Sequence, residues 1–123
     1  MESERKNSVL IVLRRSPYGS SLAKAALDVV FANAAFDQPI SVLFMGDGVL
    51  QLQPGQDSHG LGIANVGRQL ASLPLYDINT VYVDAEAAAR YKMDLTGAPL
   101  NTQLLREAEM HQLMSDHKHV LGF

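Results

Sequence analysis

Residues 42–56 read V-L-F-M-G-D-G-V-L-Q-L-Q-P-G-Q, and this stretch decides the fold. It continues an apolar run from Ile40 to Met45, broken only by Ser41, that stops abruptly at Gly46-Asp47-Gly48. A short apolar run bounded by turn residues is typical of a strand buried in a parallel sheet. In open α/β sheets the functional surface lies just beyond the carboxyl ends of the strands. The sequence therefore predicts that Asp47 lies where binding or chemistry takes place.

Two interpretations of Asp47 remain open from the residues alone. In the first it only forms a turn, because its side chain bonds local amides and we expect Gly46 and Gly48 to supply positive φ. In the second the glycines present its carboxylate to a partner or to a neighbouring subunit's site. The turn is the commoner use of such a triplet.

The rest of the chain alternates between strand and helix patterns. Strands are predicted at 8–13, 40–45, 80–83, within 95–100 and at 119–123. Helices are predicted from Ser20 or Ser21 to Phe36, from Ile63 to Leu73 before Pro74, over 84–90, and from Asn101 or Thr102 to about Ser115, with one helical turn over 49–53. This alternation predicts a flavodoxin-like, three-layer α/β/α fold with a mainly parallel sheet of about five strands. We expect a polar tail over 1–7 and a single domain over 8–123.

Composition narrows the class of protein. The 123 residues are 47% hydrophobic and 19% charged, as in ordinary globular domains. The absence of cysteine excludes disulfides, thiolate zinc sites and thiol nucleophiles in this chain. A net charge of -3 argues against direct binding of nucleic acid. With no secretory signal and no apolar run of about 20 residues, we expect a cytoplasmic protein without a membrane segment.

Four motifs together resemble a known family. They are Ser16-Pro17-Tyr18-Gly19, D-G-V-x-x-L-x-P-G-Q over 47–56, Leu75-Tyr76-Asp77-Ile78, and the closing His119-Val120-Leu121-Gly122-Phe123. The chain from about Val9 to Phe123 is similar to the DsrF/TusC branch of the DsrE/DsrF-like sulfur-relay family. The resemblance implies a small DsrEFH-type α/β domain that works without a cofactor.

The resemblance also implies partners. Family members form cytoplasmic complexes of three related subunits that pass persulfide sulfur along a relay. The implied partners are a DsrE/TusD-like and a DsrH/TusB-like sister subunit, in a heterohexamer, and a downstream sulfur acceptor protein. The relay serves either 2-thiolation of the wobble uridine of certain tRNAs or dissimilatory sulfur oxidation.

The family's sulfur-carrying cysteine belongs to the DsrE/TusD-like sister, after its third strand, about where this chain has Asp84. A carboxylate cannot carry a persulfide, so the resemblance implies a non-catalytic subunit. The residues expected to contact partners or shape their site are Tyr18, Asp47, Gly48, Val49, Gln56 and Asp84.

Two other functions are compatible with parts of the sequence, and each has a plainer interpretation. The loop 14–21 precedes a predicted helix, where a flavodoxin-like module would hold a phosphorylated small molecule with Arg15, Ser16, Gly19 and Ser20. Capping of the helix accounts for the same residues. A hydrolase-like enzyme using Asp47 or His59 carries less weight, since His59 has only Asp57 near it in a Gly-bounded loop.

Histidine, tyrosine and methionine invite further hypotheses. His117 and His119, with Asp116 and His111, would make a metal site only if both histidines lay in one strand. A solvated helix-to-strand connection is the simpler interpretation. The four tyrosines, Tyr18, Tyr76, Tyr82 and Tyr91, indicate core or interface packing rather than stacking on a base or a flavin. The methionines at 45, 110 and 114 are expected to fill gaps in apolar packing.

Overall fold

A five-stranded parallel sheet forms the centre of the molecule, in the order β4-β3-β2-β1-β5. The computed structural model describes residues 8–15, 25, 28–30, 32, 40–52, 72–76, 78, 80–97 and 101–123. The strands are β1 (Val9–Leu13), β2 (Ile40–Phe44), β3 (Thr80–Asp84), β4 (Asn101–Leu105) and β5 (His119–Gly122). The prediction of a parallel α/β sheet is confirmed.

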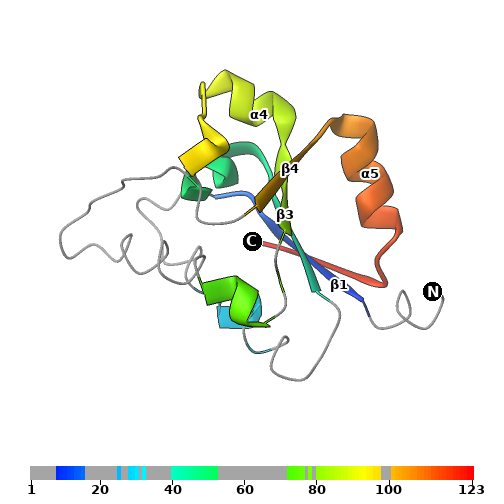
Figure 1. The fold of residues 1–123 in the computed structure, drawn as a ribbon. Coiled ribbons are helices and arrows are strands. Elements are labelled where there is room, and N and C mark those ends of the chain that lie inside the picture. The colour runs from blue at the N-terminus through cyan, green and yellow to red at the C-terminus, as the bar shows by residue number, and fades with distance from the viewer. Residues whose placement is uncertain are drawn as a thin grey trace.

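Helices lie on both faces of this sheet. The α-helices with defined bounds are α4 (Ala85–Arg90) and α5 (Glu107–Ser115), and the 3₁₀ turns are η1 (Gly46–Leu52), η2 (Leu73–Tyr76) and η3 (Leu95–Gly97). Helical residues at 25, 28–30 and 32 fall inside the helix predicted after β1. Figure 1 shows α5 on one side of the sheet and η1 and η2 on the other. Within the described residues, no helix has the length and apolar character needed to cross a membrane.

The two faces of the sheet bury different amounts of apolar surface. Successive strand residues point to opposite faces, so Ile11 and Leu10 enter different cores although both are fully buried. We call the larger cluster the major core; it contains Val9, Ile11, Leu13, Val30, Val42, Phe44, Val49, Leu52, Leu73, Ile78, Val81, Val83, Ala87 and Ala88. The minor core, on the α5 side, contains Leu10, Val12, Leu43, Leu105 and Met110. Met45 and Met114 pack against it, as the gap-filling prediction expects.

Three predicted boundaries are wrong. Asn101 and Thr102 do not cap a helix, because residues 101–105 form β4 and pair in parallel with all of β3. The helix α5 begins at Glu107 instead, after Arg106, whose backbone N–H donates to Glu109 Oε1 at 3.0 Å. Leu95–Gly97 is a 3₁₀ turn rather than strand, and residues 98–100 of the same prediction lie outside the described residues. The turn η2 also runs through Pro74, so the chain stays helical past the predicted stop.

The last strand returns to the first. β5 pairs with β1, and Val9 lies opposite His119. The backbone N–H of His119 donates to the carbonyl of Ser8 at 3.1 Å, and that of Phe123 donates to the carbonyl of Val12 at 2.9 Å. The pairing places both ends of the described chain in neighbouring strands.

Candidate functional site at the carboxyl edge of the sheet

Parallel pairing brings the carboxyl ends of the central strands to one edge. Leu13 of β1 lies opposite Phe44 of β2, and Phe44 lies opposite Val83 of β3. The segments that leave this edge are η1 after β2 and α4 after β3, and both lie at the same end of the sheet (Figure 1). Among the predicted site residues that the structure describes, Asp84 therefore lies beside the turn that carries Asp47.

Asp84 joins two of these segments. It ends β3 and is 8% exposed. Its Oδ1 accepts a hydrogen bond from the backbone N–H of Ala87 at 3.1 Å, which caps α4. Its Oδ2 accepts one from the backbone N–H of Gly46 at 3.2 Å. The carboxylate thus fixes the start of α4 against the turn after β2.

The two glycines around Asp47 serve different purposes. Gly46 has φ +54, and a Cβ built there meets nothing within 4 Å. A Cβ built on Gly48 would lie 1.8 Å from the carbonyl oxygen of Leu13, which is backbone and has no room to yield. Gly48 is not among the described residues with positive φ, so the expectation of positive φ at that position is wrong. Gly48 is required by close approach to β1.

Asp47 is exposed and bonded to a residue of another element. Its Oδ1 accepts a hydrogen bond from the hydroxyl of Tyr91, which follows α4 and is 38% exposed. That hydrogen bond, with a smaller contribution from the carboxylate's negative charge, raises the pKa of the Tyr91 phenol above its ordinary value of 10.0. The pair is an exposed polar contact between η1 and the residue that follows α4.

Two residues of η1 face inward. Val49 is fully buried in the major core, so its part in any site is to hold η1 in place. Gln51 is 4% exposed, and its Nε2 donates to the carbonyl of Arg15 at 2.9 Å. Its Oε1 is buried and accepts no hydrogen bond from the described residues. Gln51 ties η1 to the segment that follows β1.

Sequence reasoning missed Tyr91 and Gln51 as members of this edge. The sequence predicts packing for Tyr91 and gives no prediction for Gln51. The bonds that place them span 44 and 36 positions of sequence, so no local pattern carries them. A useful signal was present for Gln51 alone, a polar residue between the apolar Leu50 and Leu52.

Other predicted site residues lie outside the described part of the chain. These are Tyr18 and Gln56, together with Ser16, Gly19, Ser20, Asp57 and His59 of the alternative hypotheses. Of the loop 14–21, only Arg14 and Arg15 are described, and both are exposed. The Arg14 guanidinium lies against Gly122, where a built Cβ would come within 3.2 Å of it.

The three histidines that the structure describes are not arranged as metal ligands. His117 precedes β5, so it does not share a strand face with His119. Its Nδ1 lies 2.8 Å from the carbonyl oxygen of Leu113, and its Nε2 lies 2.8 Å from the hydroxyl of Ser41. A carbonyl oxygen only accepts, so Nδ1 carries a proton and donates to Leu113, while Nε2 and the Ser41 hydroxyl share the second hydrogen bond. Searching the described ranges finds no group of three or more His, Asp or Glu placed to hold a metal ion.

Comparisons with known proteins agree with this architecture. A model of the DsrE/DsrF-like family matches residues 7–123. The crystal structure of the YchN protein from E. coli superposes with a TM-score of 0.80 and 19% identity, covering 95% of this chain and 99% of that one. At that identity the likeness shows the fold alone.

Curated relatives lie in one branch. The intracellular sulfur oxidation protein DsrF of Allochromatium vinosum is 41% identical over 85 residues, which cover 69% of this chain and 62% of that protein. A TusC homolog of Pseudomonas aeruginosa is 31% identical over 114 residues, 93% of this chain and 96% of the relative. A TusC homolog of Vibrio parahaemolyticus is 29% identical over 112 residues, 91% and 95% of the two chains. The chain belongs to the DsrE/DsrF-like family, in its DsrF/TusC-like branch.

Proposed function

We propose that this chain is a non-catalytic subunit of a cytoplasmic sulfur-transfer complex. One observation carries the proposal: the 123 residues contain no cysteine. Persulfide sulfur is carried on a thiolate, and this chain has none to offer. Asp84, which stands about where the sister subunit's cysteine is expected, has both carboxylate oxygens engaged with backbone N–H groups. Asp84 therefore has a structural role at this position, because it connects α4 to the turn after β2.

A subunit needs surface for its partners. Large apolar side chains stay exposed on several elements: Leu75 (84%), Leu104 (53%), Val120 (43%) and Leu121 (42%). Leu75 lies in η2, while Val120 and Leu121 lie on the edge strand β5. Exposed apolar residues on an edge strand are features of contact surfaces. They support assembly with a DsrE/TusD-like and a DsrH/TusB-like sister, in a heterohexamer.

At the strand-end edge, the proposed contacts are Asp47, with the pair it makes to Tyr91, and the turn built on Gly48 and Val49. Tyr18 and Gln56 belong to the same proposal through the family motifs. Asp47 is exposed, so its second carboxylate oxygen is within reach of a partner's donor. This edge would shape or shield the sister's thiol while the chain itself carries no sulfur.

For the pathway, we propose sulfur delivery to 2-thiolation of the tRNA wobble uridine through a downstream acceptor protein. The support is the near full-length alignment with TusC homologs, at 96% and 95% of their lengths. The higher identity to DsrF extends over only 62% of that protein and keeps sulfur oxidation as the alternative. The two pathways can be separated by loading the reconstituted complex from a persulfide donor and measuring where the sulfur goes. One reaction contains tRNA with its modifying enzyme, and the other contains the sulfur-oxidation acceptor.

The subunit role is tested in two steps. The isolated chain, incubated with a persulfidated donor, should show no stable added sulfur by intact mass analysis. Co-expressed with both sister subunits, it should elute with them as one species much heavier than 13.4 kDa. A reproducible covalent sulfur adduct contradicts the non-catalytic assignment. A sister pair that assembles and transfers sulfur equally well without this chain contradicts the subunit assignment.

A further inference from the structure

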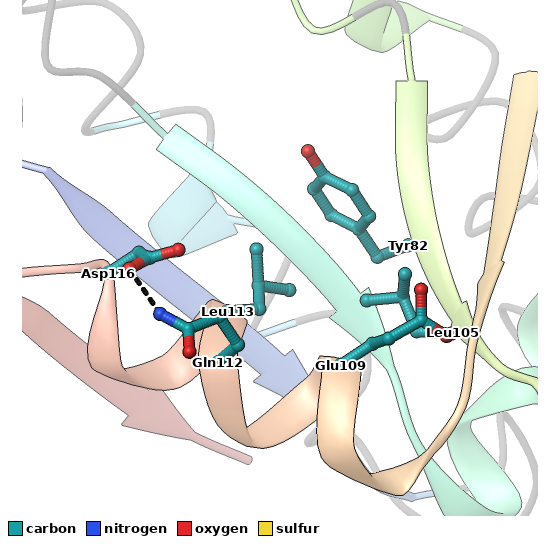
Figure 2. Close-up of a pocket in the computed structure, with 6 residues that line it drawn as sticks. All are labelled: Tyr82, Leu105, Glu109, Gln112, Leu113 and Asp116. Carbon is teal, nitrogen blue, oxygen red and sulfur yellow. Dashed lines mark hydrogen bonds between the residues drawn. The ribbon is translucent and has the colours of Figure 1, made fainter.

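An open groove of about 240 Å³ lies between α5 and the sheet. It is lined by Tyr82, Leu105, Glu109, Gln112, Leu113 and Asp116. Figure 2 shows the four α5 and helix-end residues along one side of this groove and Tyr82 of β3 across from them. None of these residues belongs to the strand-end site.

The groove exists because the sheet is covered unevenly on this face. In the part of the chain that the structure describes, α5 is the helix on the minor-core side. Met110 and Leu113 hold it in the minor core with Leu10 and Leu43 of the central strands. Tyr82 is only half-buried, and Gln103, its partner in the β3–β4 register, is exposed. An apolar floor of Leu105, Leu113 and the Tyr82 ring is therefore left incompletely covered.

The charged side chains that line the groove are both acidic. Glu109 and Asp116 are both exposed carboxylates, and none of the described residues that line the groove is basic. Glu109 Oε1 accepts from the Arg106 backbone, and Asp116 Oδ1 accepts from Gln112 Nε2 at 2.9 Å. The second oxygen of each carboxylate receives no hydrogen bond from the described residues. An apolar floor between two carboxylates is complementary to an apolar group between two cations.

The spacing of the carboxylates selects the shape of the partner. Positions 109 and 116 are seven residues, about two helical turns or about 10 Å, apart. A partner helix packed alongside α5 would match this spacing if its basic residues lay seven positions apart. An apolar residue three or four positions after the first basic residue would lie on the same face. In an extended segment, residues about 10 Å apart are three positions apart and point to opposite faces. A helix therefore fits and a strand does not.

We propose that this groove binds an amphipathic helix of a partner protein that presents arginine at positions i and i+7 with leucine or methionine between them. The apolar side chain enters the groove over Leu105 and Leu113. The guanidinium groups meet Glu109 and Asp116, and the Tyr82 ring offers one of them a π face. The proposal goes beyond the sulfur-transfer role and does not depend on it.

The test uses the full chain and a synthetic helical peptide with Arg at i and i+7 and Leu at i+3 and i+4. NMR chemical-shift mapping should place the peptide on α5 and β3. The Kd should increase as salt is added, because salt screens the attraction between the charges. The double variant Glu109→Gln/Asp116→Asn should weaken binding about three- to tenfold, since each exposed ion pair is modest. Glutamine at 109 retains the capping contact, so α5 should stay folded.

Matched controls decide the outcome. Glu107→Gln, on the same helix and outside the groove lining, should bind the peptide as the wild type does. Equal weakening by Glu107→Gln would overturn the proposal in favour of general charge attraction. Equal binding of a peptide with Glu in place of both Arg residues, or of spermidine, would also overturn it. The proposal would also be overturned if the chain alone formed a dimer and Leu113→Asp made it monomeric. A second copy of the chain would then occupy the groove.

Discussion

The hydroxyl of Tyr91 donates a hydrogen bond to the carboxylate of Asp47, joining the residue that follows α4 to the turn that follows β2. Both side chains are exposed, and they stand beside the buried Asp84 link between the same two segments. The carboxyl edge thus has an inner structural carboxylate and an outer accessible one. Substitutions can separate these roles.

Asp47→Ala should leave folding nearly intact and weaken the proposed assembly with sister subunits. The carboxylate lies at the surface, so its loss should move the melting temperature by no more than about 2 °C. Tyr91→Phe removes only the hydroxyl and should reduce assembly less. Thermal melts of the isolated chain and elution of the co-expressed complex measure the two effects. A sharp fall in melting temperature with normal assembly would mean that Asp47 only forms the turn.

The Tyr91 phenol should titrate above 10.0, because its hydrogen bond to Asp47 favours the protonated form. A pKa raised by folding stabilises the fold at pH values below the unfolded pKa. That contribution is lost as the pH rises through the folded value. Asp47→Asn should lower the phenol's pKa, seen as an earlier rise in tyrosinate absorbance near 295 nm in a difference titration. An unchanged titration curve would show that the bond is not held in solution.

Gly48→Ala should destabilise the protein far more than Gly46→Ala. The Gly48 Cβ would overlap the Leu13 carbonyl, which forces β1 or η1 to move and costs upward of about 3 kcal/mol. Alanine at Gly46 meets open space and costs about 1 kcal/mol through its positive φ. Gly46→Asn is the matched control, since asparagine tolerates that conformation. Urea denaturation measures all three, and equal losses at 46 and 48 would contradict the steric account.

Asp84→Ala should cost about 1–3 kcal/mol of unfolding free energy, because it removes the α4 cap and leaves the Gly46 N–H without its acceptor. Glu86→Ala is the control on the same helix. The Glu86 side chain is 81% exposed, and its Oε1 makes a long surface ion pair of 3.8 Å with the Arg90 guanidinium. The substitution should therefore change the free energy of unfolding by no more than about 0.5 kcal/mol. Denaturant melts give both values. Sulfur transfer that fails in a folded Asp84→Asn complex would give Asp84 a site-shaping role beyond capping.

His117→Ala should cost about 1–2 kcal/mol, since the ring bonds both the Leu113 carbonyl and the Ser41 hydroxyl. Ser41→Ala removes one of these bonds and should cost less. The double variant should resemble His117→Ala alone, because the two residues share that bond. His111→Ala, on the exposed side of α5, should be neutral. Additive losses for 41 and 117 would show that the bond does not form.

The buried strands could be predicted because their residues are mostly apolar and β-branched. β1 is buried at every residue, and β2 and β3 carry buried apolar runs. β4 reads N-T-Q-L-L and has only Leu105 buried, because it lies at the edge of the sheet. An edge strand needs little apolar sequence, so the capping residues Asn101 and Thr102 suggested a helix there.

The candidate site could be predicted in position and not in detail. A turn after a buried strand locates Asp47 at the carboxyl edge by topology alone. The partner of Asp47 depends on how α4 packs, and the need for glycine at 48 depends on the distance to Leu13. Both are properties of the tertiary structure between segments far apart in sequence. The family motif marks these positions without giving their physical reasons.

The pairing of β5 with β1 has a consequence for synthesis on the ribosome. From β1 to β4 each strand lies beside the one made before it, whereas β5 returns to β1 after an interval of about a hundred residues. Until residues 119–122 leave the exit tunnel, one whole edge of β1 has no partner. That edge belongs to Leu10 and Ile11, which are fully buried in the finished fold. Nascent chains and products truncated before this strand should therefore be the forms that bind chaperones and aggregate.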